Sequence, residues 1–548
     1  MGKSHPLLSL SGAPIADTYD YIICGAGSAG CTLANRLSED ETVSVLLIEA
    51  GKSHKHFSVT VPGMGLITML TKSRNWAFNT VPQAGLNGRK GFQPRGKMLG
   101  GSSGSNAMIY IRGHKADYDN WAALGNKGWA YKDVLPYFKK SQHREAGADE
   151  YHGQGGPLNV APIADPGSVN ATFIQACKAL QIPHNPDFNG ARQEGVGLYE
   201  VTQKNAERWS TARAFLDPIM DRPNLHIVKN TTVEKVTLEN KKATGVILKP
   251  KSEKIPLTVL AKREVILCAG AFGSPQILLL SGIGDAEKIT PHGIQHHHDL
   301  KGVGENLQDH LDYTLSYDGF VKDNFSVSWR GIFGFPKQIW KYRKHRKGVL
   351  TTNYAESGGF IYADRQEPSP DLQLHLIRGI VDDHGRKMHF SNGYTLHVCV
   401  LRPHSRGTLT LASNDPSAAP LIDPAYLSDE RDMDKLYQGA RLAQNILQSS
   451  AWSTVRGKPY YDCDAKDEET LKEDIRNHSD TVYHPVGTCK MGKGDEAVVD
   501  ARLRVYGLTG LRVIDASIMP QIISGNTNAP TIMIAEKGAD MIKEDWSH

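Results

Sequence analysis

The sequence predicts an α/β protein in which one domain, on a largely parallel sheet, carries an inserted domain built on an antiparallel sheet. Two observations lead to this prediction. Short apolar strand patterns at residues 20–23, 263–269 and 511–515 lie far apart in the chain, and closely spaced glycines and a helical pattern follow the first of them. Residues 320–470 contain stretches that alternate polar and apolar residues, such as 371–377, which is typical of antiparallel strands.

Length, charge and cysteine content limit the class of protein. A chain of 548 residues is too long for one hydrophobic core, so two closely packed domains are expected. The 63 basic and 59 acidic residues leave a formal charge of +4, too balanced for nucleic acid to be the main partner. The 7 cysteines form no C-x-x-C pair, which favours a reducing compartment. Neither an export signal nor an apolar run of about 18 residues occurs, so we expect a cytoplasmic protein.

The first predicted element is a β-α-β unit. The strand at 20–23 leads into the pattern G-x-G-x-x-G at residues 25–30, then a helix, and then a second strand at 43–49. Gly25 permits the tight turn, Gly27 lets a pyrophosphate approach the backbone, and Gly30 lets the helix pack on the sheet. Glu49 ends the second strand and would accept hydrogen bonds from the ribose hydroxyls. The unit predicts dinucleotide binding without distinguishing FAD from NAD.

The later strands indicate how the domains are divided. The strand at 263–269 leads into a glycine turn and a helix expected to begin near Ser274, and the strand at 511–515 belongs to the same sheet. We therefore expect the nucleotide-binding domain to be discontinuous, with residues 1–160, 205–312 and 475–548. Residues 161–204 and 313–474 are expected to form the inserted, substrate-facing domain.

Three longer segments resemble signatures of the glucose–methanol–choline (GMC) oxidoreductase family. The first is Gly96–Asn106, the second is Gly270–Gly284, and the third joins His484-Pro485 to Asp515–Ser517 and Gly525–Thr531. Together with Gly302–His310, the similarity extends over residues 19 to 544. The resemblance implies a Rossmann-like FAD-binding domain and oxidation of an alcohol.

The family's flavin contacts carry over to the matching positions. The resemblance implies that residues 96–108 lie along the isoalloxazine ring and pyrophosphate, and that Val233 contacts the adenine through its backbone. The expected cofactor contacts are Gly25, Gly27, Ser28, Ala29, Gly30, Glu49, Ala50, Trp76, Gly96, Met98, Gly100, Gly101, Ser102, Asn106, Ala107, Met108, Val233, Ala269, Gly270, Asp515, Ala516, Asn528, Pro530 and Thr531.

Ser105 departs from the pattern of the family members that bind flavin covalently. Those members often have a histidine immediately before the asparagine of the first signature, and here Ser105 precedes Asn106. Serine cannot form the bond that this histidine makes. We therefore expect non-covalent FAD.

Alcohol oxidation requires a base for the hydroxyl proton while a hydride leaves the carbon for the flavin nitrogen N5. Histidine suits this task because its ordinary pKa of about 6.5 lies near working pH. The resemblance assigns the base to His484 and a second catalytic position to Asn528, which would hold the alcohol oxygen. It also implies a helix that begins after Asn528, with Pro530 in its first turn and its positive end toward the flavin.

The sequence of the third segment resembles bacterial alcohol dehydrogenases more closely than choline dehydrogenases. This favours a neutral primary alcohol that is oxidised to its aldehyde. Tyr483 and Glu356 are the expected substrate contacts, and Glu356 stands where choline-oxidising relatives have a carboxylate. Quinone or another compound other than oxygen is the expected electron acceptor. Two alternatives stay open: an oxidase that uses O₂, and a lyase of the hydroxynitrile lyase type that keeps FAD only structurally.

Two cationic stretches have simple interpretations. In His296–His298, neighbouring strand residues point to opposite faces and no further ligand follows at metal spacing, so a solvent-side strand is favoured and no metal is expected. Lys337–Lys347 holds six basic residues around Trp340 and Tyr342. A solvated helix face is the simpler interpretation of this stretch. Peripheral docking on anionic lipid at the inner face of the cytoplasmic membrane is the alternative.

Overall fold

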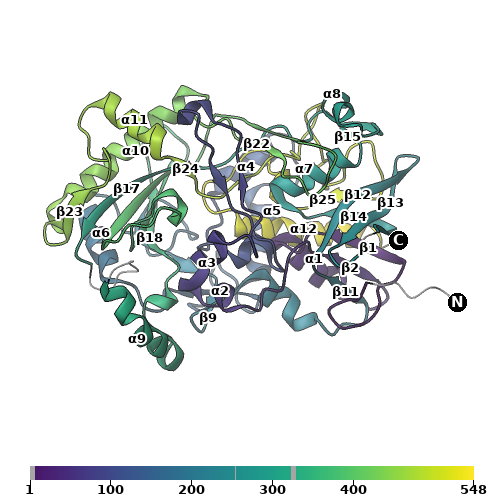
Figure 1. Ribbon diagram of the computed structural model, residues 1–548, viewed down its shortest axis with the longest axis horizontal. Helices are drawn as coiled ribbons and strands as arrows, with labels where there is room; N and C mark the ends of the chain where they lie inside the picture. The colour runs from purple at the N-terminus through teal and green to yellow at the C-terminus, as the bar shows by residue number, and fades with distance from the viewer. Residues whose placement is uncertain (1–6, 254, 322–328, 548) are drawn as a thin grey trace.

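The computed structural model describes residues 7–253, 255–321 and 329–547. Two seven-stranded sheets lie toward opposite ends of the molecule, the first on the right of Figure 1 and the second on the left. The first sheet has a parallel centre and the second is antiparallel throughout. The predicted α/β class is therefore confirmed.

The first sheet gathers strands from distant parts of the chain. In spatial order they are β11 (Leu225–Val228), β2 (Val45–Ile48), β1 (Thr18–Cys24), β14 (Leu257–Leu267), β13 (Lys242–Pro250) and β12 (Thr231–Glu239), and β25 (Leu511–Val513) pairs with the end of β14. The neighbours from β11 to β14, and β25, are parallel, so their carboxyl ends share one edge. All four residues of β2 are buried because both faces of a parallel sheet are covered.

Helices α1 (Ser28–Leu37) and α12 (Asn528–Asp545) lie side by side on this sheet and run in the same direction. Ser28 donates a hydrogen bond to Asn528 Oδ1 at 2.7 Å, and farther along both helices Arg36 makes two hydrogen bonds to Glu536 at 2.8 and 2.7 Å. Helix α5 (Tyr131–Ser141) packs on the other side of α12. Both α1 and α12 therefore begin at the edge where the parallel strands end.

Helix α7 (Gly270–Leu280) begins at Gly270 rather than near Ser274, where the sequence predicts it. Pro275 lies inside the helix and lacks an N–H, so the Ala271 carbonyl loses its helical partner. The Thr488 hydroxyl donates to this carbonyl at 2.6 Å. Asp515 accepts a hydrogen bond from the Gly270 N–H at 2.8 Å. Side chains from distant segments thus support the early start of the helix.

The second sheet has one apolar and one polar face. Its strands are β23 (Arg456–Pro459), β17 (Leu311–Gly319), β20 (Gly393–Val400), β19 (Leu372–Ile377), β18 (Ala355–Ile361) and β7 (Gly195–Leu198), with β24 (Asp480–Thr481) beside β17. Leu372, Leu374 and Leu376 of β19 join a core with α10 (Glu430–Gln448). His375 and Ile377 lie on the opposite face and border a cavity. The alternation of polar and apolar residues at 371–377 produces these two faces of the sheet.

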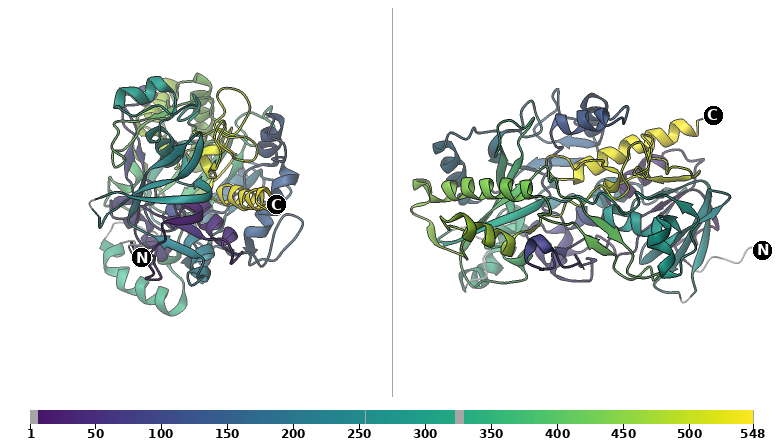
Figure 2. Two further views of the ribbon diagram at one scale, coloured as in Figure 1. Left: turned by 90° about the vertical axis from the view of Figure 1, so that its right-hand side faces the viewer. Right: turned by 90° about the horizontal axis from the view of Figure 1, so that it is seen from above.

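Helices α6 (Ser168–Ala179) and α11 (Glu468–His478) complete the layer around α10, and Figure 2 shows this layer and α12 at opposite ends of the molecule. Helix α9 (Trp329–His345) lies at the lower edge of Figure 1. The remaining helices and strands are α2 (Phe57–Thr60), α3 (Gly65–Leu70), α4 (Lys115–Ala123), α8 (Ala286–Ile289), β3 (Phe78–Asn79), β4 (Phe92–Gln93), β5 (Gln142–Arg144), β6 (Leu158–Pro162), β8 (Glu200–Val201), β9 (Gln203–Lys204), β10 (Glu207–Arg208), β15 (Ile283–Gly284), β16 (His298–Asp299), β21 (Thr408–Thr410) and β22 (Leu421–Asp423).

The two sheets draw on interleaved parts of the chain. The strands of the first come from residues 18–48, 225–267 and 511–513, and those of the second from 195–198 and 311–481. This interleaving is what two discontinuous domains require, and the boundaries between them stay a prediction. The 7 cysteines are all free thiols and all buried. Among the helices of the described residues, none has the length and hydropathy of a membrane-spanning segment.

Candidate active site

A cavity of about 440 Å³ lies between the carboxyl edge of the first sheet and the polar face of the second. The predicted site residues on its wall are Gly25, Gly27, Ser28, Glu49, Ala50, Trp76, Gly96, Gly101, Ser102, Asn106, Ala107, Met108, Val233, Ala269, Gly270, Tyr483, His484, Asp515, Ala516, Asn528 and Thr531. Ala29, Gly30, Met98, Gly100, Pro530 and Glu356 are not on the wall. The structure therefore brings most of the predicted cofactor contacts and both predicted catalytic residues to one cavity.

Glycines shape the nucleotide end of the cavity. Gly25 has a φ of +107°, and a Cβ on Gly30 would lie 1.9 Å from the Gly25 carbonyl oxygen. A Cβ on Gly101 would lie 2.7 Å from the Gly27 Cα, so the segment 96–108 passes directly against the first turn of α1. Side chains at these positions would separate backbone segments that here touch. The result is a groove floored by backbone, which suits a pyrophosphate.

Glu49, at the end of β2, is a buried carboxylate directed at this groove. Its two oxygens accept hydrogen bonds from the Ala26 N–H at 3.0 Å and the Gly51 N–H at 2.8 Å. Burial raises the pKa of Glu49 to about 7, against the two hydrogen bonds and the nearby Lys97 ammonium. Each carboxylate oxygen keeps a further lone pair for a hydroxyl donor. Glu49 is therefore fixed in the orientation that a ribose would need.

The N-termini of α1 and α12 both point at the cavity without side-chain caps. The N-cap residues are Gly27 and Thr527, and neither has a side chain that accepts a hydrogen bond from a backbone N–H of its helix. The first N–H groups of a helix have no partner within it and carry partial positive charge. Such ends are ready binding sites for anions, phosphates included.

Arg208 holds the middle of the segment 96–108. Its Nη1 donates to the carbonyl oxygen and the Oδ1 of Asn106, both at 2.7 Å. The same Oδ1 accepts from the N–H of Met108, whose φ is +59°. Burial lowers the pKa of Arg208 to about 10, so the guanidinium is still charged at neutral pH. The sequence alone does not point to Arg208, because only the fold brings it to Asn106.

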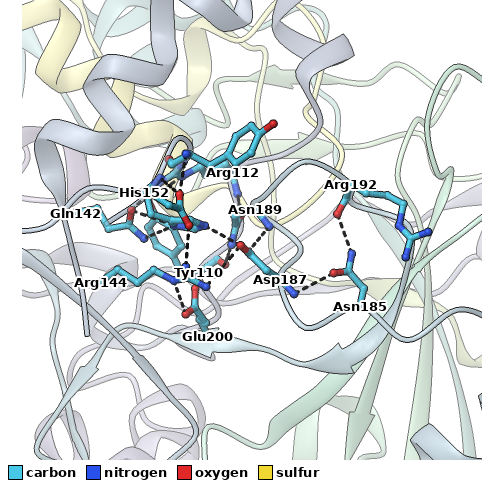
Figure 3. A network of polar contacts seen from close by, with 12 residues as sticks. Tyr110, Arg112, Gln142, Arg144, His152, Asn185, Asp187, Asn189, Arg192 and Glu200 are labelled. Carbon is cyan, nitrogen blue, oxygen red and sulfur yellow. Dashed lines mark hydrogen bonds and ion pairs between the residues drawn. The ribbon is translucent and has the colours of Figure 1, made fainter. Parts of the chain in front are cut away.

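A buried polar network, drawn in Figure 3, anchors the chain just beyond Met108. The Arg112 N–H donates to Asn189 Oδ1 at 2.9 Å, and Arg112 Nη2 donates to Gln142 Oε1 at 2.6 Å. Asn189 also donates to the Tyr110 carbonyl at 3.0 Å and through its own N–H to Asp187 at 2.9 Å. Residues 110–112 are thus fixed, and the segment that borders the cavity is held at Asn106 and again just beyond Met108.

His484 is fixed in one tautomer by a second buried histidine. His310 Nε2 lies 3.0 Å from the Leu401 carbonyl, which can only accept, so Nε2 carries the proton. Burial lowers the pKa of His310 to about 3, so its ring is neutral and Nδ1 is an acceptor. His484 Nδ1, 3.0 Å away, must then donate to it. Burial and the neighbouring His310 hold the pKa of His484 well below its usual range, which leaves Nε2 without a proton.

Asn526, Asn528 and Tyr483 contribute amide and phenol groups to the cavity wall. Asn526 Nδ2 lies 3.2 Å from His484 Nε2, although the sequence does not single out Asn526. Asn528 begins α12, and because its Oδ1 accepts from Ser28 its amide nitrogen is the group available to a ligand. The Tyr483 hydroxyl lies 2.6 Å from His384 Nδ1. The cavity thus presents the unprotonated Nε2 of His484 and the amide nitrogen of Asn528 to a small polar group.

Two further histidines on the cavity wall are not singled out by the sequence. His397 Nδ1 is hydrogen-bonded to Asp312, whereas His397 Nε2 and both nitrogens of His375 are buried with no hydrogen-bond partner among the described residues. Burial lowers the pKa of His375 to about 3. The alternation at 371–377 was the available signal, because it places His375 and Ile377 on the same face.

Glu356 lies behind the wall, in contact with protein donors. Its carboxylate accepts from the Gly167 N–H at 2.8 Å and Asn170 Nδ2 at 2.7 Å, and pairs with Arg378 at 3.3 Å. Arg378, not Glu356, is on the cavity surface. The structure therefore does not bring Glu356 to the position that a substrate contact requires.

His296–His298 lie away from the cavity. His298 Nε2 donates to the Tyr506 carbonyl at 2.9 Å and His296 Nε2 to the Gly284 carbonyl at 3.1 Å, since a carbonyl can only accept. The sequence predicts a strand at these three histidines, but in the structure only His298 lies in one, the two-residue strand β16.

Comparisons with known proteins agree with this arrangement. Family profiles described as GMC oxidoreductase match residues 19–312 and 403–535. An alcohol dehydrogenase (acceptor) of Pseudomonas putida is 46% identical over 531 residues, covering 96% of this chain and 95% of that protein. An oxygen-dependent choline dehydrogenase of Cronobacter sakazakii is 43% identical, covering 96% and 95%. Among solved structures, a pyridoxine 4-oxidase from Mesorbium loti has a TM-score of 0.86 at 29% identity, covering 97% of this chain and 99% of that one.

Proposed function

Because the chain belongs to the GMC oxidoreductase family, whose members are FAD flavoproteins, we propose that it is an FAD-dependent dehydrogenase that oxidises a neutral primary alcohol to its aldehyde. The observation that carries the proposal is the unprotonated Nε2 of His484 at the cavity, held there by His310.

The described residues fit FAD. The backbone groove at Gly25, Gly27 and Gly101 suits the pyrophosphate, and Glu49 suits the ribose. Strand β12 is an edge strand, so the backbone of Val233 has an unpaired side for the adenine. When bound, FAD supplies the hydride acceptor. Ser105 stands at the position of a covalent link in some relatives and cannot make it, so the cofactor is dissociable.

His484 acts as the general base. Its Nε2 takes the hydroxyl proton of the alcohol as the hydride leaves the neighbouring carbon, and Asn528 holds the oxygen through its amide nitrogen. The Nδ1 proton of His484 stays on the hydrogen bond to His310, so the imidazolium that forms has a fixed orientation. The amide of Asn526 keeps the ring directed at the cavity. General-base catalysis of this kind contributes about 10²–10⁴ in rate.

The cavity wall supports a neutral, largely apolar alcohol. Leu66, Met69, Ile377, Ile380 and Val381 contribute apolar surface. Among the described lining residues the acidic ones are Glu49 and Asp515, and both belong to the nucleotide end. A cationic alcohol such as choline would therefore be desolvated with no carboxylate to compensate its charge.

Quinone is the proposed electron acceptor. The Pseudomonas putida relative is named for a general acceptor, whereas the choline dehydrogenase of Cronobacter sakazakii is named oxygen-dependent. A quinone is dissolved in lipid, which places the working enzyme at the inner face of the cytoplasmic membrane. One experiment tests both the proposed reaction and the alternative hypothesis of an oxidase that uses O₂.

That experiment mixes the purified holoprotein anaerobically with medium-chain alkanols, benzyl alcohol and choline, and follows the flavin absorbance. Bleaching by the neutral alcohols is expected, with slow recovery in air and fast recovery on adding a soluble quinone. Fast recovery in air would make the protein an oxidase, and the absence of bleaching by every alcohol would contradict the proposal.

Replacing His484 tests the base. His484→Ala should slow anaerobic flavin reduction by a factor of about 10² or more, because the proposed general base is then missing. His297→Ala, at an exposed site, is the control for histidine loss. An unchanged rate in His484→Ala would refute the assignment.

A further inference from the structure

Helix α9 carries a strongly basic surface. From Trp329 to Tyr354 the chain contains no acidic residue, and the segment Lys337–Lys347 contributes six lysines and arginines. Phe333, Lys337, Trp340 and Lys344 are spaced four, three and four residues apart and so share one face of the helix. All four are exposed, Phe333 at 77% and Trp340 at 54%. This face alternates aromatic rings with ammonium groups.

The opposite face of α9 fastens the helix to the protein. Lys341 pairs with Asp165 at 3.0 Å, and the buried Tyr342 donates to the Ala206 carbonyl. Arg346, directly after the helix, pairs with Glu207 at 3.0 Å. Within the described part of the chain, Lys337, Arg343, Lys344 and Lys347 have no ion pair; Lys344 lies over the Trp340 ring at 5.3 Å. The outward cations are therefore available to an external partner.

This surface continues to the cavity wall. The turn Val349–Thr351 after α9 packs on Pro62–Met64, which leads into α3. On α3, Leu66 and Met69 line the cavity while Ile67 and Leu70 are exposed. In Figure 1, α2, α3 and α9 occupy the same lower side of the molecule.

The loop 379–391 borders the same wall. Its Ile380 and Val381 line the cavity, whereas Met388 and Phe390 are 72% and 56% exposed. A Cβ on Gly385 would lie 3.0 Å from Leu66 Cδ1, so the loop touches α3. α3 and the loop 379–391 adjoin the cavity, and like α9 they carry exposed apolar side chains. Exposed apolar side chains that gather on one side of a protein are typical of an interaction site.

We propose that this surface, formed by the outer faces of α9 and α3 and the loop 379–391, docks on an anionic phospholipid bilayer. The aromatic and aliphatic side chains enter the interfacial region, and the cations contact lipid phosphates. Charge complementarity favours a bilayer, because the basic residues have no acidic neighbours along the helix. The inference rests on the proposed function in one respect: docking here brings the apolar cavity wall next to the phase in which a neutral alcohol and a quinone dissolve.

The test is flotation of the purified holoprotein with vesicles of phosphatidylcholine alone or mixed with phosphatidylglycerol. Binding to the mixed vesicles only, weakened by salt, is expected. The variant Lys337→Glu/Lys344→Glu/Lys347→Glu should bind at least tenfold less. The control Lys235→Glu/Lys241→Glu/Lys242→Glu, an equal charge change on exposed positions of β12 and β13, should bind as the wild type does.

Anaerobic flavin reduction by a water-soluble alcohol separates this inference from the proposed function. None of Lys337, Lys344 and Lys347 lines the cavity, so their variant should keep the wild-type reduction rate while losing the vesicles. Failure of the wild type to float with the mixed vesicles would overturn docking on lipid and favour an acidic protein partner. An equal loss of binding in the control would overturn the assignment to this surface.

Discussion

The hydrogen bond between His310 and His484 decides which nitrogen of His484 carries a proton and which is the acceptor. His310 cannot donate to His484, because its single proton is used on the Leu401 carbonyl. His484 therefore donates from Nδ1, and its basic lone pair lies on Nε2. His310 touches no substrate in this arrangement and acts as a positioning residue.

His310→Phe and His310→Gln form a matched pair that tests this role. A glutamine can still donate to Leu401 and accept from His484, whereas a phenylalanine can do neither. We expect flavin reduction to fall by about tenfold or more in His310→Phe, with His310→Gln much closer to the wild type. Stopped-flow reduction at saturating alcohol makes the comparison. Equal rates in the two variants would show that the tautomer is fixed in another way.

At the scale of elements, α7 depends on a residue outside it. Pro275 removes one helical hydrogen bond, and the Thr488 hydroxyl replaces the lost donor at the Ala271 carbonyl. The carbonyl is buried, so leaving it without a partner costs the desolvation of a polar group. Thr488 thereby links the segment after His484 to the helix beside the nucleotide groove.

Thr488→Val should lower the free energy of unfolding by about 1–3 kcal/mol, because it removes the donor and keeps the shape. Thr488→Ser keeps the hydroxyl and is the control; it should be closer to the wild type in urea denaturation. If both variants lose the same stability, packing of the threonine methyl, not the hydrogen bond, supports α7.

For the whole molecule, buried neutral histidines set the response to acid. His310 and His375 have pKa values lowered by burial to about 3, against about 6.5 in the unfolded chain. Below pH 6.5 the unfolded state binds protons that the folded state does not, so stability falls as the pH decreases toward 3, by about 1.4 kcal/mol per histidine and pH unit. Glu49, whose pKa is raised to about 7, has the opposite effect on stability. Between pH 7 and 4.3 its protonation offsets the loss of stability that about one buried histidine causes.

The variant His375→Gln isolates one of these groups. Its stability should fall less between pH 7.5 and 5.5 than that of the wild type, by about 1.4 kcal/mol at the lower pH. Urea denaturation at the two pH values provides the measurement. An identical pH dependence in both proteins would mean that His375 is protonated in the folded state.

The sequence predicted features that depend on residues close together in the chain and missed those that depend on residues far apart in it. The turn at Gly25–Gly30 follows from spacings within a few residues and the start of α12 from the family resemblance, and the structure has both where expected, whereas the role of Glu49 stays a prediction. Arg208 acts through Asn106, about a hundred residues away, which no local spacing encodes. Glu356 stands at the family position, but Arg378 and Asn170 draw its carboxylate away from the cavity.

Ser28 and Asn528, which join the first turns of α1 and α12, are 500 positions apart in the chain. A ribosome that has released residues 18–48 has made the first β-α-β unit, yet the second helix end that borders the cavity is translated only hundreds of residues later. The cavity can therefore close only once both of these distant segments have left the ribosome.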